Sequence, residues 1–140
     1  MKTNGSSQWT SFKQYEDTFY LQTASVDTAT QPGTTDTLFT LGVPTGIRVK
    51  PMCIFSHGIS TSAESGIRPR VPDLQPTVTG VFSTLADAIG VTTNVARGGF
   101  DMNMDLWTDT SARINIIASV AQTVWVIKTY GWIDTRGRLS

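Results

Sequence analysis

Hydrophobic and polar residues alternate with a period of two along most of the chain from residue 37 onward. This alternation is typical of β-strands that bury one face and expose the other. It predicts strands at 37–41, within 47–55, at 112–118 and at 123–132. The last segment is apolar on both faces, which places it either at the centre of a sandwich or against another subunit. We therefore expect an all-β fold, an antiparallel β-sandwich resembling a jelly roll, with at most one short helix.

Proline and glycine residues punctuate this pattern. Pro51 lies inside the predicted strand 47–55. A strand that contains proline is expected at a sheet edge or at a bulge, because proline has no backbone N–H to donate. Residues 57–76 are rich in Ser, Pro and Gly, which predicts a long loop broken by short strands around 66–71.

Three further features are predicted between residues 82 and 107. Residues 82–89 have the apolar spacing of one or two helical turns. Gly98-Gly99 separates the strand-like segments 91–97 and 100–107, and it predicts a β-hairpin turn because glycine accepts positive φ. Aspartate and asparagine alternate with methionine through 101–105, which predicts a strand with a solvated acidic face rather than a calcium-binding loop.

The N-terminal quarter of the chain has a different character. It holds a polar tract at 23–36 and, before it, a cluster of aromatic residues: Trp9, Phe12, Tyr15, Phe19 and Tyr20. The spacing of these aromatics fits a helix and an extended segment equally well, so both remain open. We expect residues 1–36 to form an N-terminal arm and linker, and residues 37–140 to form the β-sandwich domain.

The composition agrees with a sheet protein. Of 140 residues, 22 are threonine and 12 are serine, whereas only 16% are charged. Threonine is β-branched and favours strands, and glutamate, a good helix former, occurs only twice. A single chain of this length can bury one hydrophobic core.

The charge balance and the cysteine content limit the kinds of partner and site that this chain can have. Eleven basic and eleven acidic residues give no net charge, so the chain lacks the basic field that nucleic-acid binding needs. Its one cysteine, Cys53, can form no internal disulfide and no multi-cysteine metal site, which favours folding in a cytoplasm. The N-terminus is polar, and no apolar stretch approaches the ~20 residues of a membrane span. We expect no nucleic-acid partner, no signal peptide and no membrane span.

Catalytic chemistry finds little support. His57 is the only histidine, and a Cys53–His57 pair on one strand would be separated by about 13 Å, at about 3.3 Å per residue. We expect Cys53 to be a small buried hydrophobic residue and His57 to lie in a turn or at the surface. No cofactor motif and no cluster of metal ligands occurs, and nine aspartates with four tryptophans do not by themselves select a glycosidase. The expectation is a protein without enzymatic activity, cofactor or metal.

Four segments carry a resemblance: 41–49 (LGVPTGIRV), 71–73 (VPD), 107–114 (WTDTSARI) and 131–138 (GWIDTRGR). Over residues 37–138 the chain resembles small structural proteins of tailed bacteriophages. The resemblance implies a β-sandwich with an N-terminal arm that decorates the virion, either cementing capsomers on the head or contributing to fibre and tail assemblies. Such proteins are commonly trimers or higher symmetric oligomers.

The expected function is that of a capsid decoration or cement protein, attached to the head surface through its arm and sandwich edges. The implied partners are the major capsid protein or other virion proteins and further copies of the chain, with a homotrimer favoured, in a virion assembled in the host cytoplasm. The alternative is a head-fibre, tail-fibre or adhesin module that binds host-surface carbohydrate. Candidate assembly-interface residues are the aromatics of the arm and the closing segment, which is either a loose tail or a subunit contact: Trp9, Phe12, Tyr15, Phe19, Tyr20, Trp132, Arg136 and Arg138.

Overall fold

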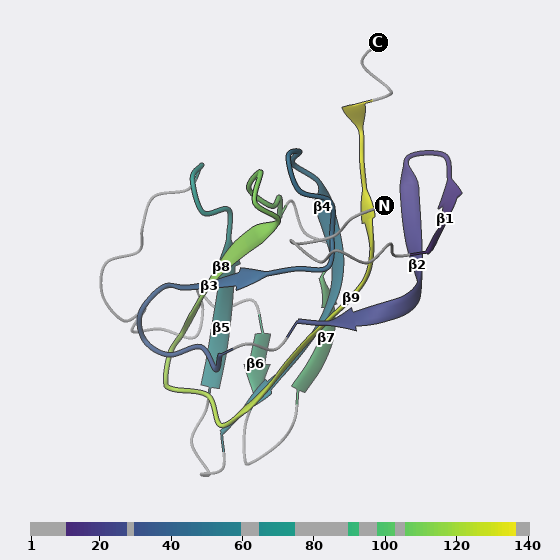
Figure 1. The fold of residues 1–140 in the computed structure, drawn as a ribbon. Coiled ribbons are helices and arrows are strands. Elements are labelled where there is room, and N and C mark those ends of the chain that lie inside the picture. The colour runs from purple at the N-terminus through teal and green to yellow at the C-terminus, as the bar shows by residue number, and fades with distance from the viewer. Residues whose placement is uncertain are drawn as a thin grey trace.

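Two antiparallel sheets make up the fold of this computed structural model (Figure 1). The structure describes residues 11–27, 30–59, 65–74, 90–92, 98–102 and 106–136. Within these ranges it contains strands and no helix, so the predicted all-β, sandwich-like fold is confirmed. The predicted helical turns at 82–89 lie outside the described residues.

The first sheet has five strands in the order β1-β2-β9-β4-β7. Their bounds are β1 Phe12–Tyr15, β2 Thr18–Val26, β9 Val124–Ile133, β4 Lys50–Gly58 and β7 Gly98–Met102. The second sheet has four strands in the order β3-β8-β5-β6. Their bounds are β3 Thr37–Thr40, β8 Arg113–Ala118, β5 Ser65–Arg70 and β6 Gly90–Thr92.

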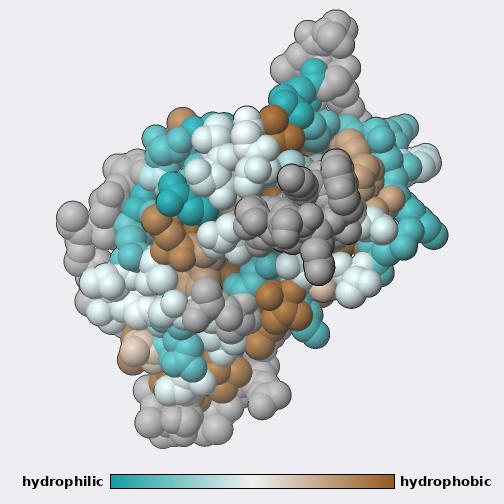
Figure 2. Space-filling model, viewed as in Figure 1, coloured by the Kyte–Doolittle hydropathy of each residue, from teal (hydrophilic) through white to brown (hydrophobic). Residues whose placement is uncertain are grey.

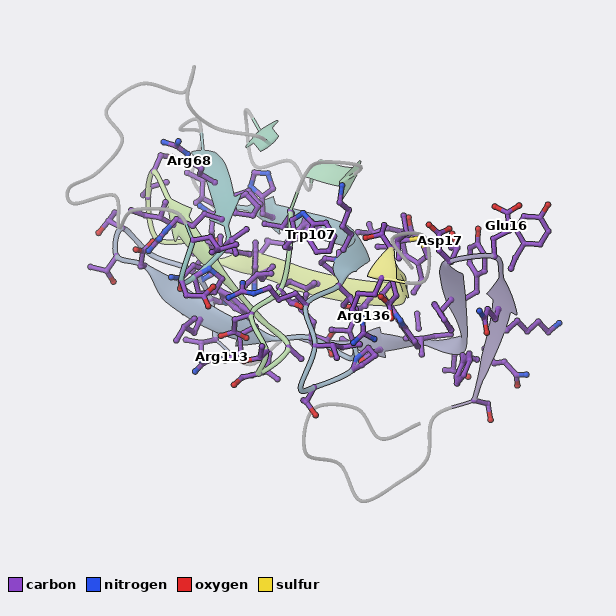
Figure 3. The ribbon with its side chains drawn as sticks, turned by 90° about the horizontal axis from the view of Figure 1, so that it is seen from above. Glu16, Asp17, Arg68, Trp107, Arg113 and Arg136 are labelled. Carbon is purple, nitrogen blue, oxygen red and sulfur yellow. The ribbon has the colours of Figure 1, made fainter. Side chains whose placement is uncertain are left out.

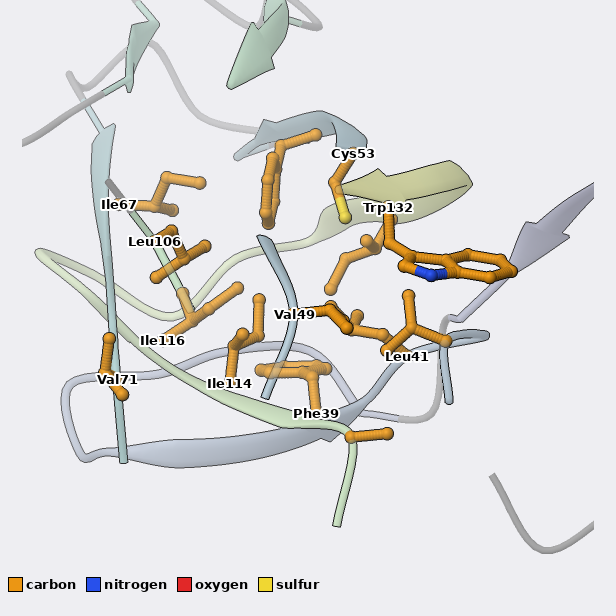
Figure 4. Close-up of a cluster of buried hydrophobic side chains, with 14 of the residues drawn as sticks. Phe39, Leu41, Val49, Cys53, Ile67, Val71, Leu106, Ile114, Ile116 and Trp132 are labelled. Atoms are coloured by element: carbon orange, nitrogen blue, oxygen red, sulfur yellow. The ribbon is translucent and has the colours of Figure 1, made fainter. Parts of the chain in front are cut away.

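The core lies between the two sheets (Figure 4). Phe39 of β3 packs against Trp125 of β9, with ring centroids 5.3 Å apart, and so joins one sheet to the other. Cys53 is 1% exposed within the same cluster, as predicted for a small buried hydrophobic residue. Strand β8 is buried along almost its whole length, because it is an inner strand of its sheet.

Strand β9 is central in the first sheet, between β2 and β4, which confirms one of the two positions predicted for it. Its pairing with β4 shifts register at Tyr130: Thr129 pairs with Cys53, whereas Gly131 pairs with Met52. This extra residue is a β-bulge, and it changes the alternation of faces along the strand. As a result Trp132 is buried on the same side as Thr129, although strict alternation would place it on the opposite side.

Pro51 lies beside this bulge, in agreement with the prediction. It pairs with Trp132 of β9, one residue before the register shift. The described part of β7 pairs with β4 only from Cys53 to His57, so no ladder to β7 forms at Pro51 there. The missing N–H of proline is therefore tolerated at this end of the strand.

The described part of the N-terminal segment is extended from Phe12 to Val26, which decides between the two structures that the aromatic spacing allowed for these residues. Strand β2 pairs with β9, and β1 pairs with β2, so residues 12–26 continue the first sheet. Just after β2, the Asp27 carboxylate accepts hydrogen bonds from the Gly42 N–H at 3.0 Å and the Thr129 hydroxyl at 2.6 Å. Leu21 is part of the core. This part of the segment is thus built into the body of the protein.

The hairpin predicted at Gly98-Gly99 is wrong. Both glycines lie within β7, where Gly98 pairs with His57 and Gly99 with Ser56 of β4. Strand β6, which was expected to pair with β7, pairs with β5 in the other sheet. Glycine permits a tight turn, but its lack of a side chain equally suits a strand that runs close beside bulky neighbours.

The prediction for His57 is also wrong, because His57 is fully buried within β4. Its ring Nδ1 lies 3.2 Å from the Gln122 Oε1. The strand continues beyond Phe55 to Gly58, so the alternation that buries Cys53 and Phe55 buries His57 as well. The prediction failed because β4 ends three residues later than expected, at Gly58, so that His57 lies within the strand and its side chain faces the core.

Burial of His57 predicts a specific pH dependence of stability. Desolvation lowers the pKa of His57 below its ordinary value of 6.5. Below about pH 6.5 the unfolded chain then binds a proton that the folded chain does not, so stability is full above this pH and falls as the pH drops toward 5. We expect a slope of up to about 1.4 kcal/mol per pH unit, measured by urea unfolding between pH 5 and 7.

The matched variant for this experiment is His57→Gln, which keeps an amide partner for Gln122 and removes the titrating ring. Because the chain has no other histidine, the slope between pH 5 and 7 should flatten in this variant. An equal slope in both proteins would show that His57 is not its source.

Candidate functional site

The β1–β2 hairpin forms the outer end of the first sheet and carries most of the predicted interface aromatics (Figure 1). Its turn is two residues long, because Tyr15 pairs with Thr18, and Glu16 adopts a positive φ of 54° as such tight turns require. Glu16 lies at the tip, directed away from the body (Figure 3). The Asp134 N–H donates to the Asp17 carbonyl at 2.8 Å, so the base of the turn is held to the chain that follows β9.

One face of the hairpin packs on Trp132. The Phe19 ring stacks on the Trp132 ring, with centroids 5.1 Å apart and planes 4° apart. The Phe12 ring meets Trp132 edge-on at 5.7 Å. Gly131 allows this approach, because a Cβ at that position would collide with the Phe19 carbonyl oxygen and the Met52 side chain. The hairpin is thereby fixed to the sheet by aromatic contacts as well as by backbone pairing.

The opposite face of the hairpin is exposed, and we call its side chains Lys13, Tyr15 and Tyr20 the hairpin surface. Tyr15 is 71% exposed and Tyr20 is 46% exposed. Lys13 pairs across the two strands with Tyr20, and both line a shallow hollow of about 420 Å³. The space-filling view shows hydrophobic groups dispersed among polar ones on the face in view (Figure 2). Tyrosine is amphipathic, so a surface built on it is not marked by hydropathy alone.

The predicted interface residues therefore separate into distinct groups. Tyr15 and Tyr20 lie on the hairpin surface, whereas Phe12 and Phe19 pack on Trp132. Trp132 is only 2% exposed and belongs to the chain's own core rather than to a loose tail. Arg136 is exposed and pairs with Asp134. Trp9 and Arg138 lie outside the described residues.

A second site is a pocket of about 530 Å³ built from loops at one end of the sandwich. Its lining comes from the turn before β4, the loop after β5, the loop before β8 and the segment after β9: Gly46, Ile47, Arg48, Leu74, Trp107, Thr110, Thr135 and Arg136. These are, within one residue, the four segments that carry the resemblance to phage structural proteins. We call this site the loop pocket.

Two ion pairs border the loop pocket. Arg48 forms a bidentate salt bridge with Asp73: its Nη1 lies 2.8 Å from Oδ1, and its Nη2 contacts Oδ2. The hydrogen bond lowers the pKa of Asp73 and raises that of Arg48. Arg136 forms a similar bidentate salt bridge with Asp134, in which Nε lies 2.9 Å from Oδ1 and Nη2 lies 2.6 Å from Oδ2. These hydrogen bonds lower the pKa of Asp134. Each guanidinium is thus matched by a carboxylate.

The wall of the loop pocket is held by Asp109, which is 5% exposed. Its carboxylate accepts from the backbone N–H groups of Ser111 at 2.9 Å and Arg113 at 2.8 Å, and from the Arg113 side chain at 2.9 Å. The Thr110 carbonyl accepts from the Gly46 N–H at 2.7 Å, which ties this loop to the turn before β4. The pocket is consequently preorganised by hydrogen bonds.

Sequence reasoning missed Ile47, Arg48, Leu74 and Trp107 as members of a site, because they converge only through the topology of two sheets. The described residues contain no group of three His, Cys, Asp or Glu side chains that could hold a metal ion. No helix long and apolar enough to cross a membrane occurs among them. Comparisons with protein-family models, with curated proteins and with solved structures find no match. Function is therefore inferred from the chain's own residues.

Proposed function

We propose that this chain is a structural protein of a tailed-bacteriophage virion, a decoration or cement protein that attaches to the head surface. Attachment uses the hairpin surface together with the sandwich edges, and the principal partner is the major capsid protein. Copies of the chain associate as a homotrimer on the particle. The observation that carries the proposal is the hairpin surface: two exposed tyrosines on a sheet-edge hairpin that is fixed to the core.

The chemistry of the hairpin suits attachment to another protein. In the described part of the chain, β1 pairs with a strand on one side only, so its other edge can accept a strand from a partner. Tyrosine supplies a large contact area for little loss of conformational entropy, and it is enriched among residues that dominate interface energies. A hairpin already held by Trp132 loses little further freedom on binding.

The double variant Tyr15→Ser/Tyr20→Ser tests this proposal. Each truncated interface tyrosine is expected to weaken binding by at least about tenfold, which corresponds to about 1.4 kcal/mol. Binding is measured by co-sedimentation with head shells purified without the chain. Point variants are required because deletion of residues 1–36 would also remove Leu21 from the core.

The matched control is Leu74→Ser, which alters a similarly exposed residue, 65% against 71% for Tyr15, away from the hairpin. It should bind like the unmodified chain, and all three proteins should have the same melting temperature. Undiminished binding of the double tyrosine variant would contradict attachment through the hairpin surface.

A second candidate function is a head-fibre, tail-fibre or adhesin module that binds host-surface carbohydrate. The observation that favours it is the loop pocket, which places a half-buried tryptophan, Trp107, beside paired arginines and carboxylates. The two functions use different surfaces, so each can be tested without the other.

A further inference from the structure

We infer that the loop pocket binds a neutral pyranose, the six-membered sugar ring of a host-surface glycan. The inference rests on the second candidate function, because it names the ligand class and the site of that function. It is independent of attachment through the hairpin surface, because no residue of the hairpin surface lines the pocket.

The apolar part of the loop pocket suits the C–H face of a sugar ring. Ile47 and Trp107 are half-buried and pack against the main core, so the apolar side of the pocket is held rigidly. Leu74 is 65% exposed at the same site and adds an apolar side chain that water surrounds. Trp107 is also held by Lys50, whose Nζ lies 5.0 Å from the ring centroid and which does not line the pocket.

The polar part of the loop pocket suits hydroxyl groups. A sugar hydroxyl both donates and accepts, so it is best met by adjacent donors and acceptors. Arg48 and Arg136 line the pocket and supply donors, because each salt bridge leaves further guanidinium N–H groups unused. Their partners Asp73 and Asp134 lie beside the lining, and Thr110 and Thr135 bring hydroxyl groups to it. Solvent reaches both arginine side chains: Arg48 is half-buried, at 31% exposure, and Arg136 is exposed, at 60%.

The charge balance selects a neutral ligand over an acidic one. Each arginine at the pocket already faces its own carboxylate, so neither presents an uncompensated positive charge to an anion. An acidic sugar would have to displace Asp73 or Asp134 or accept repulsion from it. A neutral sugar meets no such opposition.

Size and rigidity agree with this ligand. A volume of about 530 Å³ lies within the range of about 300–1,000 Å³ that small-molecule pockets occupy. The Asp109 hydrogen bonds and the Gly46–Thr110 contact hold two of its loops before any ligand arrives. Little ordering is then required on binding.

The experiment uses the full chain on a glycan array, followed by calorimetric titration with methyl glycosides of neutral hexoses and with sialic and glucuronic acids. We expect binding to a neutral glycan, weakened at least tenfold by Arg136→Gln and by Trp107→Ala. Arg136 is exposed, so its variant folds even where loss of Trp107 disturbs the core. The control Tyr15→Ser should bind sugar like the unmodified chain.

The other outcomes separate the inference from the function on which it rests. Preference for the acidic sugars, or neutral binding that both pocket variants retain, overturns the inference and leaves carbohydrate binding standing. Binding to no glycan of either class overturns the inference and the second candidate function together.

Discussion

Replacing Trp132 by alanine is expected to lower the free energy of unfolding by about 3–5 kcal/mol. Trp132 is 2% exposed, stacks on Phe19 and meets Phe12 edge-on, so its loss leaves a cavity and removes both aromatic contacts. Domains of this size have stabilities of about 5–15 kcal/mol, and the loss would be a large fraction of that. Urea unfolding measures the change.

The same substitution should loosen the hairpin selectively. Trp132 anchors β2 through Phe19, so hydrogen exchange at the backbone amides of β2 should accelerate more than exchange in β8. Trp132→Phe is the matched control, because it keeps a ring on Phe19 and should lose clearly less stability. A loss below about 1 kcal/mol in the alanine variant would contradict the placement of Trp132 in the core.

Replacing Asp36 by alanine is expected to cost about 3–5 kcal/mol of stability as well. Asp36 precedes β3, and its carboxylate receives two nitrogens of Arg70, at the end of β5, one of them at 3.2 Å. Arg70 is 4% exposed, so removing Asp36 takes away a carboxylate that contacts a buried guanidinium. In β8, the Asn115 amide is oriented so that its oxygen accepts a hydrogen bond from Arg70 at 3.0 Å. Its nitrogen donates to the Thr37 carbonyl at 3.2 Å. The cluster therefore joins three strands of the second sheet.

The control is the double variant Asp36→Leu/Arg70→Met, which removes both charges and fills the space with apolar side chains. Because burial of the two charges is itself unfavourable, this protein should recover more than half of the stability lost in Asp36→Ala. Chemical unfolding of the three proteins at one pH provides the comparison. Equal losses in the single and double variants would contradict a role for the broken ion pair.

The positions of three strands were predictable from the sequence. The observed bounds of β3, β8 and β9 each differ from the predicted segments by one residue at most at either end. Strand β4 runs from 50 to 58 rather than within 47–55, because Ile47 and Val49 belong to the turn and approach that precede it. Because the predicted strand ends at Phe55, it leaves out His57, and the burial of His57 was therefore not predicted.

Features that depend on two distant segments were not predictable. Residues 12–26 join the sheet because β9 accepts β2 as a neighbour, and local aromatic spacing holds no information about that pairing. The bulge at Tyr130 brings Trp132 to the core side of β9, and the composition of the closing segment, which indicates a loose tail or a subunit contact, holds no sign of this bulge. Gly98-Gly99 was read as a turn because glycine serves turns and strands alike.

The two candidate sites also differ in how far the sequence predicts them. Tyr15 and Tyr20 are candidates from the sequence, because an aromatic cluster near a polar tract is visible there, and the structure leaves both side chains exposed. The loop pocket was not found, although its four segments were those that carried the family resemblance. Their convergence at one end of the sandwich requires the order of strands in both sheets, which no single segment encodes.

Quantitative mass spectrometry of virus particles purified from cells that produce this chain tests the proposed virion role most directly. If the chain decorates the head, it should remain with the particles through density-gradient purification, at a fixed ratio to the major capsid protein in every preparation. Its absence from purified particles, with abundant protein in the lysate from which they came, would contradict the proposed function.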